Sequence, residues 1–212
     1  MNAIRMLLMF TTLGLMTGLA TANQSKYFNF KVFLDDKEIG QHTFVVSPRN
    51  KQIAVTSEAR FDVKFWFISA YSYLHTSNEI WQGDCLHTIE ASTDDNGDSL
   101  FVRGSQKDQS LQLQTHAGNK TLQGCIRTFA YWNPALLSST HLLNVQTGKL
   151  EPVTFRLLGE AAITVRDQAV TALHYRIENP GFSIDLWYSR TQEWLALEST
   201  TESGARLRYL AL

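Results

Sequence analysis

Hydrophobic and polar residues alternate along most of the chain, and a period of two is typical of β-strands. Between Tyr27 and Leu34, for example, Phe28, Phe30 and Val32 fall on one side of such a strand. Similar segments follow at residues 39–46, 52–61, 86–93, 99–104, 111–115, 120–122, 153–158, 161–165, 170–177, 182–188, 194–200 and 206–212. The pattern therefore predicts about ten to twelve strands.

Short turn signals separate these segments. Asn96-Gly97 is the strongest hairpin signal, because both residues accept the backbone angles of a tight turn. Residues 47–50 form a second predicted turn, with Pro48 in its favoured second position. Connections this short join neighbouring antiparallel strands. We predict a mainly β fold, a single large curved antiparallel meander sheet or open barrel.

Two segments depart from the alternation. Residues 63–75 are aromatic without a clean period, which indicates a strand that leads into a short helix or a kinked loop. In residues 133–144, Asn133 suits a helix N-cap and Pro134 the first helical position, and leucines follow at near-helical spacing. We expect one short helix there, packed as a plug against the concave face of the sheet.

Composition limits the class of protein. The chain has 212 residues, of which 44% are hydrophobic and 18% charged, and its net charge is −1. Charged residues lie below the roughly 25% of ordinary domains, which excludes a disordered chain. The near-zero net charge gives no reason to expect a nucleic-acid partner. Since no linker-like shift in composition divides the chain, we expect a single domain over residues 23–212.

The N-terminus has the organisation of a secretory signal peptide over residues 1–22. Arg5 precedes an apolar stretch at residues 6–19, and Ala20-Thr21-Ala22 is a small-residue cleavage site. No later apolar stretch is long enough to span a membrane as a helix after cleavage. We expect an exported protein, periplasmic or secreted. A transmembrane barrel is the competing architecture, and the cysteine pair and short strands count against it.

The two cysteines, Cys85 and Cys125, both follow the predicted signal. An even number of cysteines in an oxidising compartment favours a structural disulfide. Two free buried thiols are the first alternative. A redox or metal site is the second, although the spacing is not C-x-x-C and no further ligands cluster nearby.

Motifs for catalysis and cofactor binding are absent from the sequence. The histidines (His42, His75, His87, His116, His141 and His174) are scattered, and neither a zinc-binding, a serine-hydrolase nor a nucleotide-binding pattern occurs. We therefore expect no metal, no cofactor and no enzyme activity. An enzyme acting on envelope glycans or lipids stays as an alternative, because Glu58, Asp62, Glu79 and Glu90 lie near aromatic positions.

Aromatic residues concentrate in two stretches, residues 61–81 and 129–132. A bond between the cysteines would bring these stretches together. Two interpretations stay open: a core packed with rings, or an apolar pocket with hydroxyl and indole donors at its rim. For the second interpretation, the candidate ligand-binding residues are Trp66, Tyr71, Tyr73, Trp81, Tyr131 and Trp132.

Several short sequence motifs of this chain resemble motifs that occur together in one known family. They are IWQGDCL at 80–86, TDDNG at 93–97, FAYWNP at 129–134, LLNVQTG at 142–148, LWYS at 186–189, WLALES at 194–199 and LRYL at 207–210. Through them the chain, from Tyr27 to Leu212, resembles an uncharacterised family of exported bacterial β-rich proteins, a domain of unknown function. The resemblance implies export and a single β-domain, and it implies no activity and no catalytic residues.

These observations lead to a hypothesis of a soluble periplasmic binding or carrier protein. Its ligand would be a hydrophobic or amphipathic, lipid-like small molecule on an aromatic-lined concave face. Half-barrel carriers of lipid moieties offer a loose analogy in architecture. The main alternative is an interaction or assembly module that binds an envelope protein partner and no small ligand.

Overall fold

The antiparallel meander that the hydrophobic pattern predicts is the main feature of the structure, a computed structural model that describes residues 24–65, 68–201 and 203–212. Within these residues, thirteen strands form one sheet. Its first run consists of β1 (Lys26–Leu34), β2 (Lys37–Arg49), β3 (Gln52–Phe65), β4 (Ile68–Gln82), β5 (Cys85–Asp95), β6 (Asp98–Lys107), β7 (Ser110–Thr115) and β8 (Gly118–Gln123). Its second run consists of β11 (Thr154–Val165), β12 (Gln168–Asn179), β13 (Phe182–Tyr188), β14 (Trp194–Thr200) and β15 (Arg206–Ala211).

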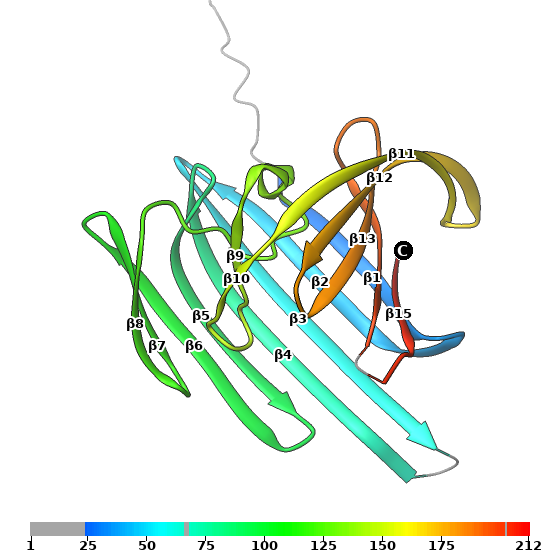
Figure 1. Cartoon of the computed structure of the whole chain (residues 1–212), viewed down its shortest axis with the longest axis horizontal. Coiled ribbons are helices and arrows are strands. Elements are labelled where there is room, and N and C mark those ends of the chain that lie inside the picture. The colour runs from blue at the N-terminus through cyan, green and yellow to red at the C-terminus, as the bar shows by residue number, and fades with distance from the viewer. Residues whose placement is uncertain (1–23, 66–67, 202) are drawn as a thin grey trace, which may run out of the picture.

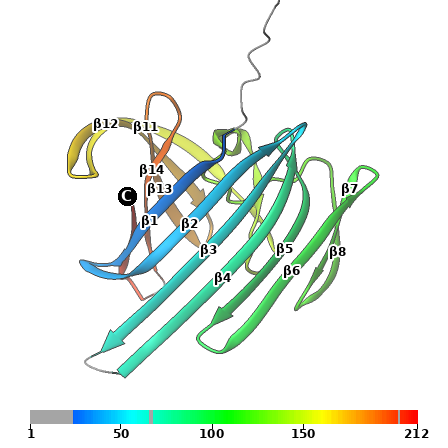
Figure 2. The same cartoon turned by 180° about the vertical axis from the view of Figure 1, so that it is seen from behind.

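Pairing between the first and the last strand joins the two runs. β1 pairs antiparallel with β15, with Phe30 opposite Ala211, so the strand order is β11 to β15 followed by β1 to β8. The two edges of the sheet are therefore β8 and β11, which come from the middle of the sequence. Figures 1 and 2 show the sheet curving between these edges without closing. The predicted fold class is confirmed.

The structure corrects two local predictions. Residues 63–75 contain neither a helix nor a kinked loop within their described part, because β3 continues to Phe65 and β4 begins at Ile68. Tyr73 stacks on Phe61 of the neighbouring strand, with ring centroids 5.2 Å apart, and such cross-strand pairs stabilise a sheet. Pro48 lies inside β2, and the turn falls two residues later, at Asn50 and Lys51, with φ of 56° at Asn50.

Residues 124–153, here named the crossing segment, lie against the concave face of the sheet (Figure 1). They contain a 3-10 helix, η1 (Pro134–Ser138), and a hairpin of β9 (His141–Leu143) and β10 (Leu150–Pro152). The Asn133 side chain caps η1 as predicted, accepting a hydrogen bond of 3.0 Å from the Ala135 amide. The predicted helix is wrong beyond Ser138, because residues 141–143 pair with β10 instead.

The leucines of the crossing segment hold it on the sheet. Leu143 packs into a cluster around Trp81, whereas Leu136 and Leu142 pack into a second cluster around Phe30 and Trp194. All three leucines are at most 1% exposed. The prediction that this leucine-rich segment plugs the concave face is therefore confirmed.

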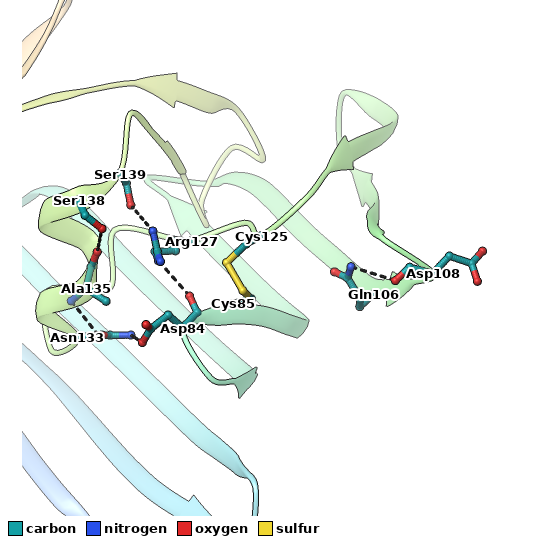
Figure 3. The surroundings of a disulfide bond; sticks show 10 residues. All are labelled: Asp84, Cys85, Gln106, Asp108, Cys125, Arg127, Asn133, Ala135, Ser138 and Ser139. Carbon is teal, nitrogen blue, oxygen red and sulfur yellow. Dashed lines mark hydrogen bonds between the residues drawn. A yellow bond between two sulfur atoms is a disulfide. The ribbon is translucent and has the colours of Figure 1, made fainter.

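A disulfide between Cys85 and Cys125 ties the start of the crossing segment to β5, as Figure 3 shows. Arg127 supports the same junction, donating hydrogen bonds to the Asp84 carbonyl at 3.2 Å and to the Ser139 hydroxyl at 3.3 Å. The predicted disulfide is confirmed, and it is compatible with an exported protein.

The described residues contain no helix of the length and apolarity that a membrane crossing requires. The predicted signal peptide, residues 1–22, lies outside the described residues, so its cleavage stays a prediction.

Replacing both cysteines by serine should lower the free energy of unfolding by about 4 kcal/mol, because the bond closes a loop of about 40 residues in the unfolded chain. Urea unfolding followed by tryptophan fluorescence measures the difference. Adding a reductant to the wild-type protein should reproduce the loss and leave the double variant unchanged. Equal unfolding curves for the oxidised wild type and the variant would contradict the prediction.

Candidate functional site

A cavity of about 310 Å³ lies between the sheet and the crossing segment. The inner faces of β2, β3 and β4 form one wall, and residues 128–132 and 144–146 of the crossing segment form a second. Phe182 and Ile184 of β13 and Ser199 and Thr200 of β14 complete the lining. Strands from the two ends of the sequence thus face each other across one space.

The wall on β2 to β4 is polar where the alternation would place apolar core residues. His42, Ser57, His75, Ser77 and Glu79 all line the cavity from the inner faces of these strands. Within this stripe, Nε2 of His42 lies 2.7 Å from the Ser57 hydroxyl. A buried polar stripe lowers stability unless its groups are paired, so it marks a candidate binding site.

Both histidines of the stripe are neutral near pH 7. Burial, and to a smaller extent repulsion from His75, lowers the pKa of His42 to about 3. Burial likewise lowers the pKa of His75 to about 4. Nδ1 of His75 lies 2.8 Å from the Thr93 hydroxyl, whereas Nδ1 of His42 is buried without a hydrogen-bond partner among the described residues. The two imidazoles can therefore form hydrogen bonds in the cavity, and they carry no charge there.

Glu79 is the ionisable carboxyl in the cavity wall, and it is 6% exposed. It accepts hydrogen bonds from the Trp81 indole at 2.7 Å and from the Ser77 hydroxyl at 3.3 Å. Burial raises the pKa of Glu79 to about 7, and these two hydrogen bonds oppose the rise only in part. The carboxyl therefore changes its charge near neutral pH.

Tyrosines of the sheet form hydrogen bonds to the crossing segment. Tyr73 donates a hydrogen bond of 3.3 Å to the Gln146 side chain, and Tyr188 donates one of 2.7 Å to the Tyr131 carbonyl. Burial raises the pKa of Tyr73 and of Tyr131 above the usual range of a phenol. Both hydroxyls stay protonated at neutral pH and so remain hydrogen-bond donors.

The structure places the predicted aromatic residues in three different settings. Tyr73, Tyr131 and Trp132 line the cavity. Trp81 is fully buried behind the wall, in edge-to-face contact with Trp132 at 5.4 Å between ring centroids, and Tyr71 instead donates a hydrogen bond of 2.7 Å to Asp95. Trp66 lies outside the described residues.

Reasoning from the sequence named Glu79 only as a candidate catalytic acid, and it did not single out the other inward-facing polar residues as a binding site. Ser57 shows the signal that could have found them, because it lies between Val55 and Ala59 on the buried face of a strand. The acids raised for a glycosidase do not converge: Glu79 faces the cavity, and Glu58, Asp62 and Glu90 are exposed. Across the described residues, histidines, cysteines and acids form no group of three or more that could hold a metal ion.

A larger hollow of about 1040 Å³ lies on the opposite face of β3 to β8. Figure 2 shows this face of the sheet without a covering element. Its lining is mostly polar and includes an exposed ion pair between Arg103 and Glu90 at 3.4 Å. Since no second layer encloses it, we regard the inner cavity as the candidate site.

Comparisons with known proteins agree with this architecture. The model of a family described as "Domain of unknown function (DUF6134)" matches residues 30–211. A crystal structure of a "Beta-barrel-like Protein of Domain of Unknown Function DUF1849" from Brucella abortus is similar, with 9% sequence identity, a TM-score of 0.63, and coverage of 89% of this chain and 94% of that chain. At such identity the likeness shows the fold alone. No curated protein matches the chain.

Replacing Glu79 by glutamine should remove a pH-dependent loss of stability. Because the pKa of Glu79 is raised from 4.5 to about 7, its favourable contribution is complete below about pH 4.5 and is lost as the pH rises through 7. As the pH rises from about 4.5 to 8, the free energy of unfolding of the variant should therefore increase by about 3 kcal/mol relative to that of the wild type.

Urea unfolding at several pH values measures this difference in stability, in which the contributions of His42 and His75 cancel. Glu58→Gln, which removes an exposed carboxylate from the outer face of β3, is the matched control and should show a much smaller change. A pH-independent difference between the wild type and Glu79→Gln would refute the assignment.

Proposed function

The chain belongs to the DUF6134 family, a domain of unknown function, and we propose that it is an exported binding or carrier protein that holds an amphipathic ligand in the inner cavity. The observation that supports this function is the combination of surfaces around one space. Phe44, Phe129 and Trp132 supply apolar surface, and His75 and Glu79 of the polar stripe supply polar contacts. Ligand sites commonly join a mainly apolar lining to a few convergent polar groups.

The size of the cavity limits the ligand. Its volume of about 310 Å³ lies at the lower end of the range of roughly 300–1,000 Å³ that is usual for small-molecule sites. Along β4 it extends from Tyr73 to Glu79, which is roughly 20 Å at about 3.3 Å per residue. The space is long and narrow, so it suits a slender molecule or one acyl chain better than a whole multi-chain lipid.

Export supports the same function. The sequence predicts a signal peptide, and the disulfide is compatible with an oxidising compartment. A carrier there would shield an apolar molecule from water between membranes. The position of the cavity, between the sheet and the crossing segment, is suited to that task.

A second candidate function is an interaction module for an envelope protein. The edge strand β11 carries two exposed leucines, Leu157 and Leu158, with 55% and 40% exposure. Unpaired edge strands can bind an extended segment of another protein by adding it to the sheet. This function needs no small ligand, so the two candidates predict different results in a ligand-binding assay.

Filling the cavity should abolish binding of an uncharged amphiphile. We expect purified, delipidated protein to bind N-phenyl-1-naphthylamine with a saturable rise in its fluorescence. Ser199 lies on β14 in the cavity wall, so Ser199→Phe should occupy the space and weaken binding by about tenfold or more.

Ser92→Phe is the matched control, because it adds the same ring to the exposed face of β5. It should leave the affinity for the probe within about twofold of the wild type. Absence of saturable binding, or an equal effect of the two substitutions, would refute a cavity ligand and favour the interaction module.

A further inference from the structure

The carboxylate of Glu79 faces the cavity without a cationic partner. Its hydrogen-bond donors, the Trp81 indole and the Ser77 hydroxyl, are both neutral. None of the ion pairs formed within the described part of the chain includes Glu79. Buried charges in proteins are normally paired, and an unpaired one lowers stability by several kcal/mol.

The two donors nevertheless orient the carboxylate. Trp81 is fully buried and donates to Oε2, and Ser77 donates to Oε1, so each oxygen already accepts one hydrogen bond. Two donors on two oxygens match the ionised form of the group better than the protonated form. Each oxygen keeps further lone pairs that can accept from a ligand. The local structure thus orients the carboxylate and supplies no counter-charge for it.

The rest of the cavity supplies no positive charge. Neither lysine nor arginine lines it within the described residues, and its histidines, His42 and His75, are neutral near pH 7. Beside the Tyr73 end of the cavity, Asp95 accepts a hydrogen bond from Gln146 and adds a second carboxyl group to the same region. An anionic ligand would meet like charge, whereas a cation would complement the site.

We propose, building on the cavity-binding function above, that the ligand is a slender amphiphile whose protonated amine pairs with the Glu79 carboxylate. Val55, opposite Glu79 in the pairing of β3 and β4, and Trp132 of the crossing segment flank this end of the cavity with apolar surface. The chain of the ligand extends from there toward Phe44 and Phe129. The ammonium group supplies the counter-charge that the protein lacks.

Competition between three probes of equal chain length tests the charge of the head group. Octylamine, octan-1-ol and octanoate each displace N-phenyl-1-naphthylamine from delipidated wild-type protein at about pH 8, where the amine is protonated. We expect octylamine to bind about tenfold or more tightly than octan-1-ol, because a hydrogen bond to a charged group is worth more than a neutral one. Octanoate should bind most weakly of the three.

The variant Glu79→Gln assigns the selectivity to this residue. The ratio of the affinities for octylamine and octan-1-ol should fall to within about threefold, because the amide keeps the shape and removes the charge. Glu58→Gln, with an exposed carboxylate on the outer face of β3, should keep the wild-type ratio.

The outcomes separate the two proposals. If the fluorescent probe does not bind wild-type protein, the cavity-binding function fails. If the probe binds, and octan-1-ol displaces it as well as octylamine does, the function stands and the ammonium proposal is overturned. The wild-type comparison alone decides this point, even if the variant does not fold. A ratio that Glu79→Gln leaves unchanged would overturn the role of Glu79.

Discussion

The anchoring of the crossing segment over the concave face is the constraint on which the rest of the structure depends. A curved sheet of thirteen strands exposes a broad apolar face that must be covered. The disulfide fixes one end of the segment, and Leu136, Leu142 and Leu143 bury its middle in both core clusters. Because the segment rests on these leucines, residues 128–132 and 144–146 are held above the polar stripe, and the space between them is the cavity.

The polar stripe lowers the stability that this packing provides. The contributions of His42 and His75 are lost as the pH falls from about 6.5 toward their lowered pKa values of about 3 and 4, and that of Glu79 is lost as the pH rises from 4.5 through about 7. Apolar side chains at these positions would avoid both losses. Groups that lower stability and converge on one cavity are typical of functional sites.

The hydrophobic pattern predicted the antiparallel meander, because strand alternation and short turns are local features, and the even number of cysteines behind a predicted signal peptide predicted the disulfide. The pattern did not predict β4, where the polar residues His75, Ser77 and Glu79 at inward positions hide the period of two, and it placed the turn near Pro48 two residues too early. The pairing of β1 with β15 also had no local signal. Among the cavity residues, the sequence indicated Tyr73, Tyr131 and Trp132 as candidates. The position of His75 in the cavity wall follows only from the structure, in which the crossing segment covers the sheet.

The topology explains why the site could not be read from any one stretch of sequence. The cavity wall of β2 to β4 comes from residues 42–79, and the opposite residues of β13 and β14 come from the last third of the chain. These parts meet because β15 pairs with β1 in the middle of the sheet. Contacts of such long sequence separation form late and slowly in folding. The cavity is therefore a property of the complete sheet, and it forms only when the C-terminal strands have joined the N-terminal ones.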